Sequence, residues 1–240
     1  MNKMKNDGAV KWPELIPGIL IKRYKRFLAD VRLPSGETVT AHCPNSGSMQ
    51  ACCLPGQPVY LSRHDTPERK LKYTWELIQM PTSLVGVNTQ VPNKLVKAAI
   101  EHGDIKQLAG YDSVTAEVKT GPHSRLDLLL QKNDGEKCYI EVKNCTLVEN
   151  GHACFPDAVT TRGAKHLSEL ARLRKDGNRC AMFFLIQRMD AKTFSPVDHI
   201  DPDYGRELRR VHRLGVEIFV YDVDITFKRI RIRRELPCLL

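Results

Sequence analysis

The first third of the chain consists of short runs in which apolar and polar residues alternate. Turns that contain Pro or Gly separate these runs, which is the pattern of short antiparallel strands. About five strands at this spacing predict a small barrel of the OB-like kind. The predicted strands cover residues 19–24, 27–33, 38–42, 59–62 and 73–79.

The pattern changes after Pro92, where longer elements begin. Apolar residues recur at helical spacing in 93–101, and three strands follow it. We expect Asp157 to cap a long helix whose inner face carries Val159, Leu167 and Leu170, and a continuous apolar run then predicts a buried strand. The remaining elements predicted are strands at 114–119, 125–131, 138–144, 180–186, 216–221 and 227–233 and a helix at about 203–213. The fold class is therefore mixed α/β, with an OB-like domain in residues 1–85 and an α/β domain in residues 86–240.

Charge narrows the classes of partner. The 240 residues contain 37 Lys and Arg against 28 Asp and Glu, a formal net charge of +9. A basic excess of this size is typical of proteins that bind nucleic acid, an anionic membrane surface or acidic small molecules, and an ordinary solvated surface explains it equally well.

The apolar segments and the cysteines bear on location. We expect no signal peptide, membrane anchor or membrane partner, because no apolar run approaches the length that crosses a bilayer. The eight cysteines form no CxxC pair, which favours free thiols in a reducing compartment. We therefore expect a cytoplasmic protein without an organic cofactor, and the oligomeric state stays open.

The most informative segment is a predicted hairpin with two acidic residues. The turn at 133–135 reads Asn-Asp-Gly, a strong hairpin signal. If this turn centres on Asp134, cross-strand partners have numbers that sum to 268, so Asp127 and Glu141 stand opposite each other. Strand alternation then places them on one face with Lys143. The other face is the core face, formed by Leu126, Leu128, Leu130, Ile140 and Val142.

Two carboxylates opposed at about 5 Å repel each other by about 3 kcal/mol at an effective dielectric constant of 20. Such a pair needs a cation nearby. Arg125 or Lys143 could supply it, and so could a hard divalent ion such as Mg²⁺ or Mn²⁺. The alternative is a solvated face whose charges neutralise each other locally.

An Asp followed by Glu-x-Lys on the next strand resembles the PD-(D/E)XK nuclease fold. The resemblance implies that Asp127 and Glu141 hold Mg²⁺, while Lys143 orients the attacking water or offsets charge on the phosphate. Glu117 is a candidate third metal ligand, and Glu101 a weaker one. Leu126 stands where the motif has Pro, at a position that varies.

Over nearly its full length the chain resembles the sugar fermentation stimulation protein A family. The resemblance includes His-Cys-Pro-Asn-Ser-Gly-Ser-Met at 42–49 and Tyr-Ile-Glu-Val-Lys-Asn-Cys-Thr-Leu at 139–147. It implies a bacterial DNA-binding protein with an N-terminal OB-like domain and a C-terminal PD-(D/E)XK nuclease-like domain. The other matching stretches are 23–31, 73–77, 117–119, 124–127, 155–160, 162–163 and 165–167.

Several basic residues are candidates for nucleic-acid binding. Arg162, Lys165 and His166 fall on the helix after Glu-x-Lys, where a solvated helix face is the rival interpretation. Basic and aromatic residues alternate around residue 25, as on surfaces that stack single strands, or as on a strand whose aromatics face the core. The candidates in the first domain are Arg23, Lys25 and Arg26, and Arg125 in the second joins them. The turn Asn45-Ser46-Gly47 has no chemical task that its sequence discloses.

These features lead to one main functional hypothesis. We expect a DNA-binding protein of little sequence specificity with a Mg²⁺-dependent phosphodiesterase site at Asp127, Glu141 and Lys143. The alternative is a non-catalytic DNA-binding regulator of sugar-metabolism genes that retains a nuclease fold. A small-molecule hydrolase is the weakest candidate, because neither a Ser-His-Asp elbow nor zinc-ligand spacing occurs.

Overall fold

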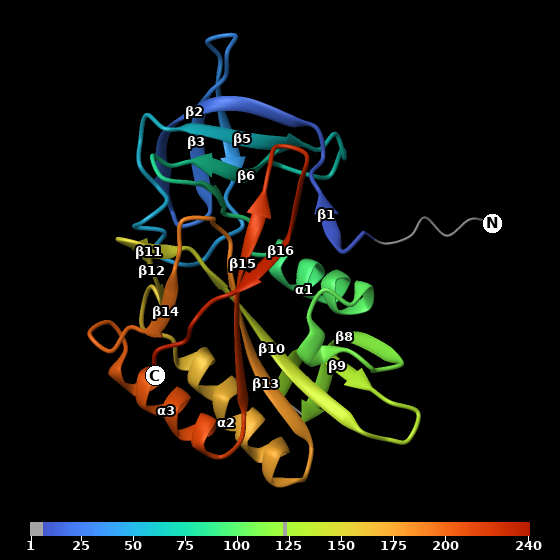
Figure 1. Cartoon of the computed structure of the whole chain (residues 1–240). Helices are drawn as coiled ribbons and strands as arrows, with labels where there is room; N and C mark the ends of the chain where they lie inside the picture. Colours follow the sequence, from blue (N-terminus) through green and yellow to red (C-terminus); the bar gives the residue numbers. More distant parts are fainter. Residues whose placement is uncertain (1–6, 122–123) are drawn as a thin grey trace, which may run out of the picture.

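The computed structural model describes residues 7–121 and 124–240, which form a barrel stacked on an α/β domain (Figure 1). The barrel is a six-stranded sheet in the order β4-β3-β2-β5-β6-β7, and an added pairing between β4 and β6 closes five of its strands into a ring. All five strands predicted in this region are present. With the additional strand β7, the strands of this sheet are β2 (Leu15–Tyr24), β3 (Leu28–Arg32), β4 (Thr38–His42), β5 (Pro58–Arg63), β6 (Tyr73–Gln79) and β7 (Leu84–Gly86).

The second domain is built on a seven-stranded mixed sheet in the order β1-β16-β15-β13-β10-β9-β8. Its central strands β10, β13 and β15 are parallel, and β9 and β8 continue the sheet as antiparallel strands. The predicted fold class is confirmed: an OB-like barrel is followed by an α/β domain that contains the β9–β10 hairpin and its flanking helices. The strands are β1 (Ala9–Lys11), β8 (Ser113–Gly121), β9 (Ser124–Gln131), β10 (Lys137–Cys145), β13 (Arg179–Ile186), β15 (Glu217–Ile225) and β16 (Arg229–Glu235).

Helices cover both faces of this sheet (Figure 1). On one face lie α2 (Thr161–Lys175) and α3 (Pro202–Arg213), which contact each other and bury Leu167, Leu170 and Leu208. On the other face lies α1 (Val91–His102). The remaining elements are η1 (Lys106–Leu108) and a small sheet of β11 (Leu147–Glu149), β12 (His152–Phe155) and β14 (Thr193–Pro196).

The core under α1 is shared by the two domains. Leu95 and Ala99 of α1 pack in the same buried cluster as Leu77 and Leu84 of the barrel. Burial of apolar surface stabilises the folded state by about 25 cal/mol per Å². Moving the barrel away from the α/β domain would expose these side chains, so the shared core fixes the relative orientation of the two domains.

The short strand β1 departs from the domain division expected from the sequence. It pairs antiparallel with β16 of the second domain, although residues 1–85 were assigned to the first. Trp12, which follows it, is buried in the shared core and donates its indole N–H to the carbonyl of Thr226. A three-residue strand is too short to show an alternating pattern, which is why the sequence did not indicate it.

The start of α2 also differs from the prediction. Thr160 is the N-cap residue, and its side chain accepts a hydrogen bond from the backbone N–H of Gly163. Asp157 therefore precedes the helix and does not cap it. Val159 is 72% exposed, so its assignment to the inner face of the helix was wrong.

One core assignment on β9 was wrong as well. Leu128 belongs to the core under α1, as expected, but Leu126 belongs to the core under α2 and α3. The regular pairing is interrupted between them: Glu117 on β8 adopts a left-handed φ of 58°, and the β9–β10 pairing ends at Leu128. Leu126 lies beyond this interruption, on the opposite face.

Candidate active site between the two domains

Asp127 lies at the point where β9 and β10 separate. The predicted register is confirmed by the pairing of Leu128 with Ile140, whose numbers sum to 268. Beyond this pair the backbones of β9 and β10 no longer pair, and the carboxylate of Asp127 bonds to the backbone of β10 instead. Its Oδ2 accepts the backbone N–H of Val142 at 2.8 Å, and its Oδ1 accepts the side-chain N–H of Asn93 at 2.7 Å.

Glu141 points from β10 toward α2 and is only 2% exposed. Its Oε1 accepts a hydrogen bond from the Nζ of Lys143 at 2.5 Å and contacts the Nδ1 of His166. Its other oxygen, Oε2, is buried and has no hydrogen-bond partner among the residues that the structure describes. A buried, unpaired carboxylate oxygen is costly, so this atom marks a place where a further group is needed.

The two carboxyl groups have opposite pKa shifts. Burial, and then the charge of Glu141, raises the pKa of Asp127 from 3.8 to about 6. Burial also acts to raise the pKa of Glu141, but the contacts with His166 and Lys143 outweigh it and lower that pKa. Glu141 is therefore ionised well below neutral pH, whereas ionisation of Asp127 is disfavoured and needs a higher pH.

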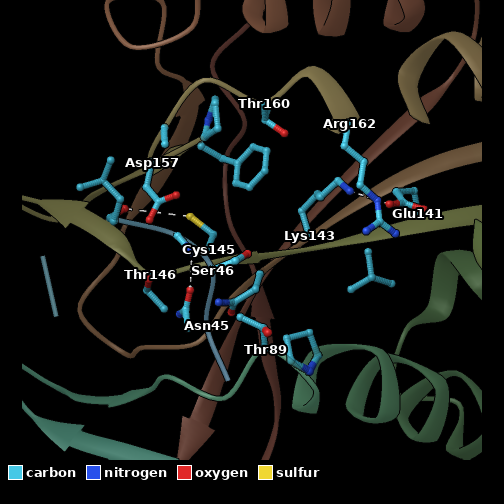
Figure 2. Close-up of a pocket in the computed structure, with 18 of the residues that line it drawn as sticks. Asn45, Ser46, Thr89, Glu141, Lys143, Cys145, Thr146, Asp157, Thr160 and Arg162 are labelled. Atoms are coloured by element: carbon cyan, nitrogen blue, oxygen red, sulfur yellow. Dashed lines mark hydrogen bonds and ion pairs between the residues drawn. The ribbon is translucent and has the colours of Figure 1, made fainter. Parts of the chain in front are cut away.

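These residues line a pocket of about 530 Å³ to which both domains contribute (Figure 2). Figure 2 shows Glu141, Lys143 and Arg162 together at one side of the pocket and Asp157 at the other. The barrel contributes Arg26 and the turn at 45–47.

The turn Asn45-Ser46-Gly47 leads into Ser48 and Met49, which contact the second domain. Asn45 donates its side-chain amide to the carbonyl of Val87 and accepts the backbone N–H of Gly47. The carboxylate of Asp157 accepts hydrogen bonds from the Ser48 hydroxyl and the Met49 backbone N–H, both at 3.2 Å. Asp157, which the sequence suggested as a helix cap, thus holds one side of the pocket to the other.

Arg23 supports the same turn. Its guanidinium donates to the backbone carbonyls of Arg26, Asn45, Gly47 and Ser48 at 2.8–3.1 Å. Four carbonyls occupy most of the five N–H donors of an arginine. The structure therefore gives Arg23 a positioning contact rather than the free phosphate contact suggested by its sequence.

Lys25 and Arg26 form the exposed tip of the hairpin between β2 and β3. Both adopt left-handed backbone conformations, with φ of 45° and 64°, which are uncommon for residues other than glycine. Arg26 lines the pocket, so this tip brings a basic side chain to its rim.

The expected third acidic ligand does not reach the pair. Glu117 is exposed and forms an ion pair with Arg125 at 2.9 Å. It is not part of the pocket lining that contains Asp127 and Glu141. Its left-handed φ of 58° interrupts β8 at the position opposite Asp127. Glu101, the weaker candidate, forms an i,i+4 ion pair with Lys97 on α1.

A basic groove adjoins the pocket. It runs between α2 and the β8–β9 hairpin, and Arg162 and His166 line both the groove and the pocket. Arg162 and Lys165 form no ion pair with a carboxylate in the described part of the chain. The basic residues of the groove are Arg125, Arg162, Lys165 and Arg172.

The sequence did not predict two of the contacts in the site. Asn93 reaches Asp127 from the first turn of α1, and no spacing in the sequence links positions 93 and 127. His166, expected to face nucleic acid, turns inward onto Glu141, and its side chain is only 13% exposed. Its position four residues after Arg162 was the available signal, because helical spacing puts the two on one face, and that face is the pocket wall.

The number of carboxylates in the pocket suits a hard divalent ion, although no larger ligand cluster surrounds them within residues 7–121 and 124–240. Among the described residues no group of three or more His, Cys, Asp or Glu side chains is arranged to hold a metal. Mg²⁺, however, keeps several waters and is usually held by one or two protein carboxylates. Asp127 and the unpaired Oε2 of Glu141 supply that number.

The barrel, the β9–β10 hairpin and the carboxylates of Asp127 and Glu141 together define a protein in which an OB domain is joined to a nuclease-like α/β domain. Residues 21–87 match the model of the SfsA N-terminal OB domain, and residues 90–229 match that of the sugar fermentation stimulation protein RE domain. The chain therefore belongs to the sugar fermentation stimulation protein A family, as its sequence indicated.

Individual relatives agree with this assignment. The chain is 52% identical to the sugar fermentation stimulation protein homolog of Geotalea daltonii over 95% of its length and 98% of the relative's. It is 53% identical to the homolog of Geotalea uraniireducens, over 92% of this chain and 96% of that one. Among solved structures, Pyrococcus furiosus SfsA in complex with Ca²⁺ superposes with a TM-score of 0.88 at 26% identity, covering 96% of this chain and 98% of the other. No helix in the described residues has the length and apolar character needed to span a membrane.

Proposed function

We propose that this protein binds DNA with little sequence preference and hydrolyses phosphodiester bonds at Asp127, Glu141 and Lys143 with the help of a divalent cation. The observation that carries the proposal is the unpaired, buried Oε2 of Glu141 beside Asp127, whose ionisation is disfavoured by burial and by the charge of Glu141. A divalent cation at this place would relieve both costs.

Asp127 and Glu141 would hold the cation, Mg²⁺ or Mn²⁺, and the Ca²⁺ complex of Pyrococcus furiosus SfsA supports a divalent ion in this family. When bound, such an ion polarises a phosphate and lowers the pKa of a water molecule that it holds. Asn93 and the Val142 N–H orient the Asp127 carboxylate.

Lys143 would act on the phosphate or on the attacking water. Its ammonium lies 2.5 Å from Glu141 Oε1 and 3.1 Å from His166 Nδ1, and its side chain is 15% exposed. A cation held in a largely desolvated site acts more strongly on developing negative charge than one in water. In the adjoining groove, Arg162 and Lys165 would contact phosphates on either side of the scissile one.

One observation favours a second candidate, a non-catalytic DNA-binding regulator. Glu141 already contacts two cationic or polar nitrogen groups, on Lys143 and His166, so much of its charge is compensated by the protein itself. In that case the acids would be structural and the basic groove alone would provide function.

A cleavage assay separates the two candidates. End-labelled duplex, single-stranded and branched DNA are incubated with Mg²⁺ or Mn²⁺ and the wild-type protein, Asp127→Ala or Asp203→Ala. Asp203 is an exposed acid on α3, so its variant matches the charge change away from the pocket. The proposal predicts metal-dependent cleavage that Asp127→Ala abolishes and Asp203→Ala retains. Binding without cleavage of any substrate would support the regulator.

A further inference from the structure

Glu141 lies deep in the pocket with Lys143 and His166 around it. The side chains of Glu141, Lys143 and His166 are 2%, 15% and 13% exposed. Arg162 and Lys165, which line the adjoining groove, are exposed. A phosphate that rests on the protein surface can therefore contact the groove, but a phosphate must enter the pocket to reach Glu141.

The pocket is too small for a double helix. Its volume of about 530 Å³ falls in the range of roughly 300–1,000 Å³ that holds one drug-sized molecule. The major groove of B-DNA alone is about 12 Å wide, and the whole helix is wider. One strand can supply a single nucleotide to such a space, as enzymes that extrude a nucleotide from a duplex do.

The barrel side of the pocket is held firmly. Arg23 ties the tip of the β2–β3 hairpin to the turn at 45–48 through four carbonyls. Ser48 of that turn and the adjoining Met49 donate hydrogen bonds to Asp157 of the second domain. The approach is close, since a Cβ added to Gly47 would lie 2.5 Å from the Asp157 carboxylate.

Further contacts keep the two domains together behind the pocket. Gly86 of the barrel donates its N–H to the carbonyl of Gln187 at 2.8 Å. Arg188 donates to the carbonyls of Thr146 and Ala51, which belong to different domains. With the shared apolar core, these contacts oppose a hinge motion that would widen the pocket enough for a duplex.

We infer, building on the function proposed above, that the substrate is a single strand or an unpaired segment of nucleic acid. The pocket takes nucleotides of one strand, and the groove lined by Arg162 and Lys165 holds the phosphates that flank them. Lining groups suit unstacked bases: Val159 is 72% exposed, and the partly buried Phe155 also lines the pocket. Apolar and aromatic contact with bases tolerates any sequence.

Filling the pocket provides the test. Val159→Trp adds bulk at an exposed lining position, and Ser46→Trp does the same from the barrel side in case the first variant fails to fold. Leu214→Trp, at an exposed position that lies outside the pocket lining, is the matched control. Fluorescence anisotropy in EDTA measures binding of a single-stranded DNA, a single-stranded RNA and a blunt duplex of equal length. Cleavage of the same three is then measured with Mn²⁺, and thermal melting checks that each variant is folded.

The inference predicts that folded pocket variants lose at least about tenfold in affinity for single strands while their affinity for the duplex is unchanged. It also predicts that any cleavage falls on unpaired nucleotides and is lost in the same variants. The DNA and RNA arms show which sugar the pocket accepts. Equal effects of Val159→Trp on single strand and duplex, or none on either, would overturn the inference.

The two proposals can fail separately. Selective loss of single-strand binding without any cleavage would support this inference and contradict the phosphodiesterase. Cleavage of the blunt duplex as fast as the single strand would support the phosphodiesterase and overturn the inference.

Discussion

The carboxylate of Asp127 accepts the backbone N–H of Val142 at 2.8 Å, in place of the strand-to-strand hydrogen bond that the separating backbone no longer makes. This contact fixes the position of one acid beside the other, because Val142 follows Glu141 directly. The surroundings of Asp127 disfavour its ionised form, because burial and the nearby charge of Glu141 raise its pKa to about 6.

The raised pKa predicts how stability depends on pH without metal. The ordinary pKa of Asp127 is 3.8, so the folded protein binds its proton more tightly than the unfolded chain. The stabilisation is fully present below about pH 4 and is lost as the pH rises through 6, by about 3 kcal/mol in total. Asp127→Asn keeps the side chain neutral at every pH. We expect its free energy of unfolding in EDTA to exceed that of wild type by about 1–3 kcal/mol at pH 8, with a smaller difference near pH 4.

Urea denaturation in EDTA at the two pH values measures this difference. A variant that is clearly less stable than wild type at pH 8 would show that the Asp127 carboxylate is a structural acceptor for Val142 and Asn93 and not a strained functional acid.

The opposite result is expected for the partner acid. Contacts with His166 and Lys143 lower the pKa of Glu141, so its ionised form stabilises the fold above the ordinary pKa of 4.5. Glu141→Gln removes a buried negative charge from two nitrogen groups, and breaking such a buried pair costs about 3–5 kcal/mol. Denaturation at pH 8 should therefore show Glu141→Gln destabilised and Asp127→Asn stabilised. Similar changes in both variants would refute the division of roles between the two acids.

Salt dependence tests the basic groove. If Arg162 and Lys165 contact phosphates, replacing both by Ala should weaken binding to all sequences alike and reduce the log–log salt slope by about 2. Arg206→Ala with Arg213→Ala removes the same charge from α3 and serves as the control, since neither residue lines the groove. Equal slopes for both double variants would mean that only net charge matters, and a loss restricted to one sequence would indicate base reading.

Arg23 should behave as a positioning residue. Because its guanidinium donates to four backbone carbonyls, Arg23→Ala should lower the free energy of unfolding by about 1.5–3 kcal/mol, the typical range for hydrogen bonds to a charged group. Lys presents a single ammonium and should restore little of this loss. The salt slope measured for folded Arg23→Ala should equal that of wild type. A slope reduced by about 1 would instead identify Arg23 as a phosphate contact.

Local patterns predicted most of the fold. The Asn-Asp-Gly turn at 133–135 was enough to set the register of β9 and β10, because a tight turn leaves one pairing that keeps the leucines inside. The strands of the barrel followed from alternation between Pro and Gly turns. Helix α2 was misplaced at its start because Asp157 and Thr160 are both good capping residues, and only the contact of Asp157 with the barrel decides between them.

The site was predicted in part for the same reason. Asp127, Glu141 and Lys143 lie close together because they share one hairpin, which local sequence encodes. Asn93 contacts Asp127, and Ser48, next to the turn at 45–47, contacts Asp157 of the same pocket. Each contact joins segments more than thirty residues apart, which no spacing rule covers. Regular alternation along β8 predicts that Glu117 faces the two acids. Its left-handed φ interrupts that alternation, and Glu117 forms an ion pair with Arg125 outside the pocket.

A calorimetric titration of metal-free protein with Mn²⁺ at pH 8 measures directly whether Asp127 and Glu141 hold a divalent cation. We expect saturable binding to the wild type that Asp127→Asn loses, while Asp203→Asn, which removes an exposed acid on α3, binds as the wild type does. Binding of equal strength to the wild type and Asp127→Asn, or no binding to the wild type, would contradict a metal site at Asp127 and Glu141.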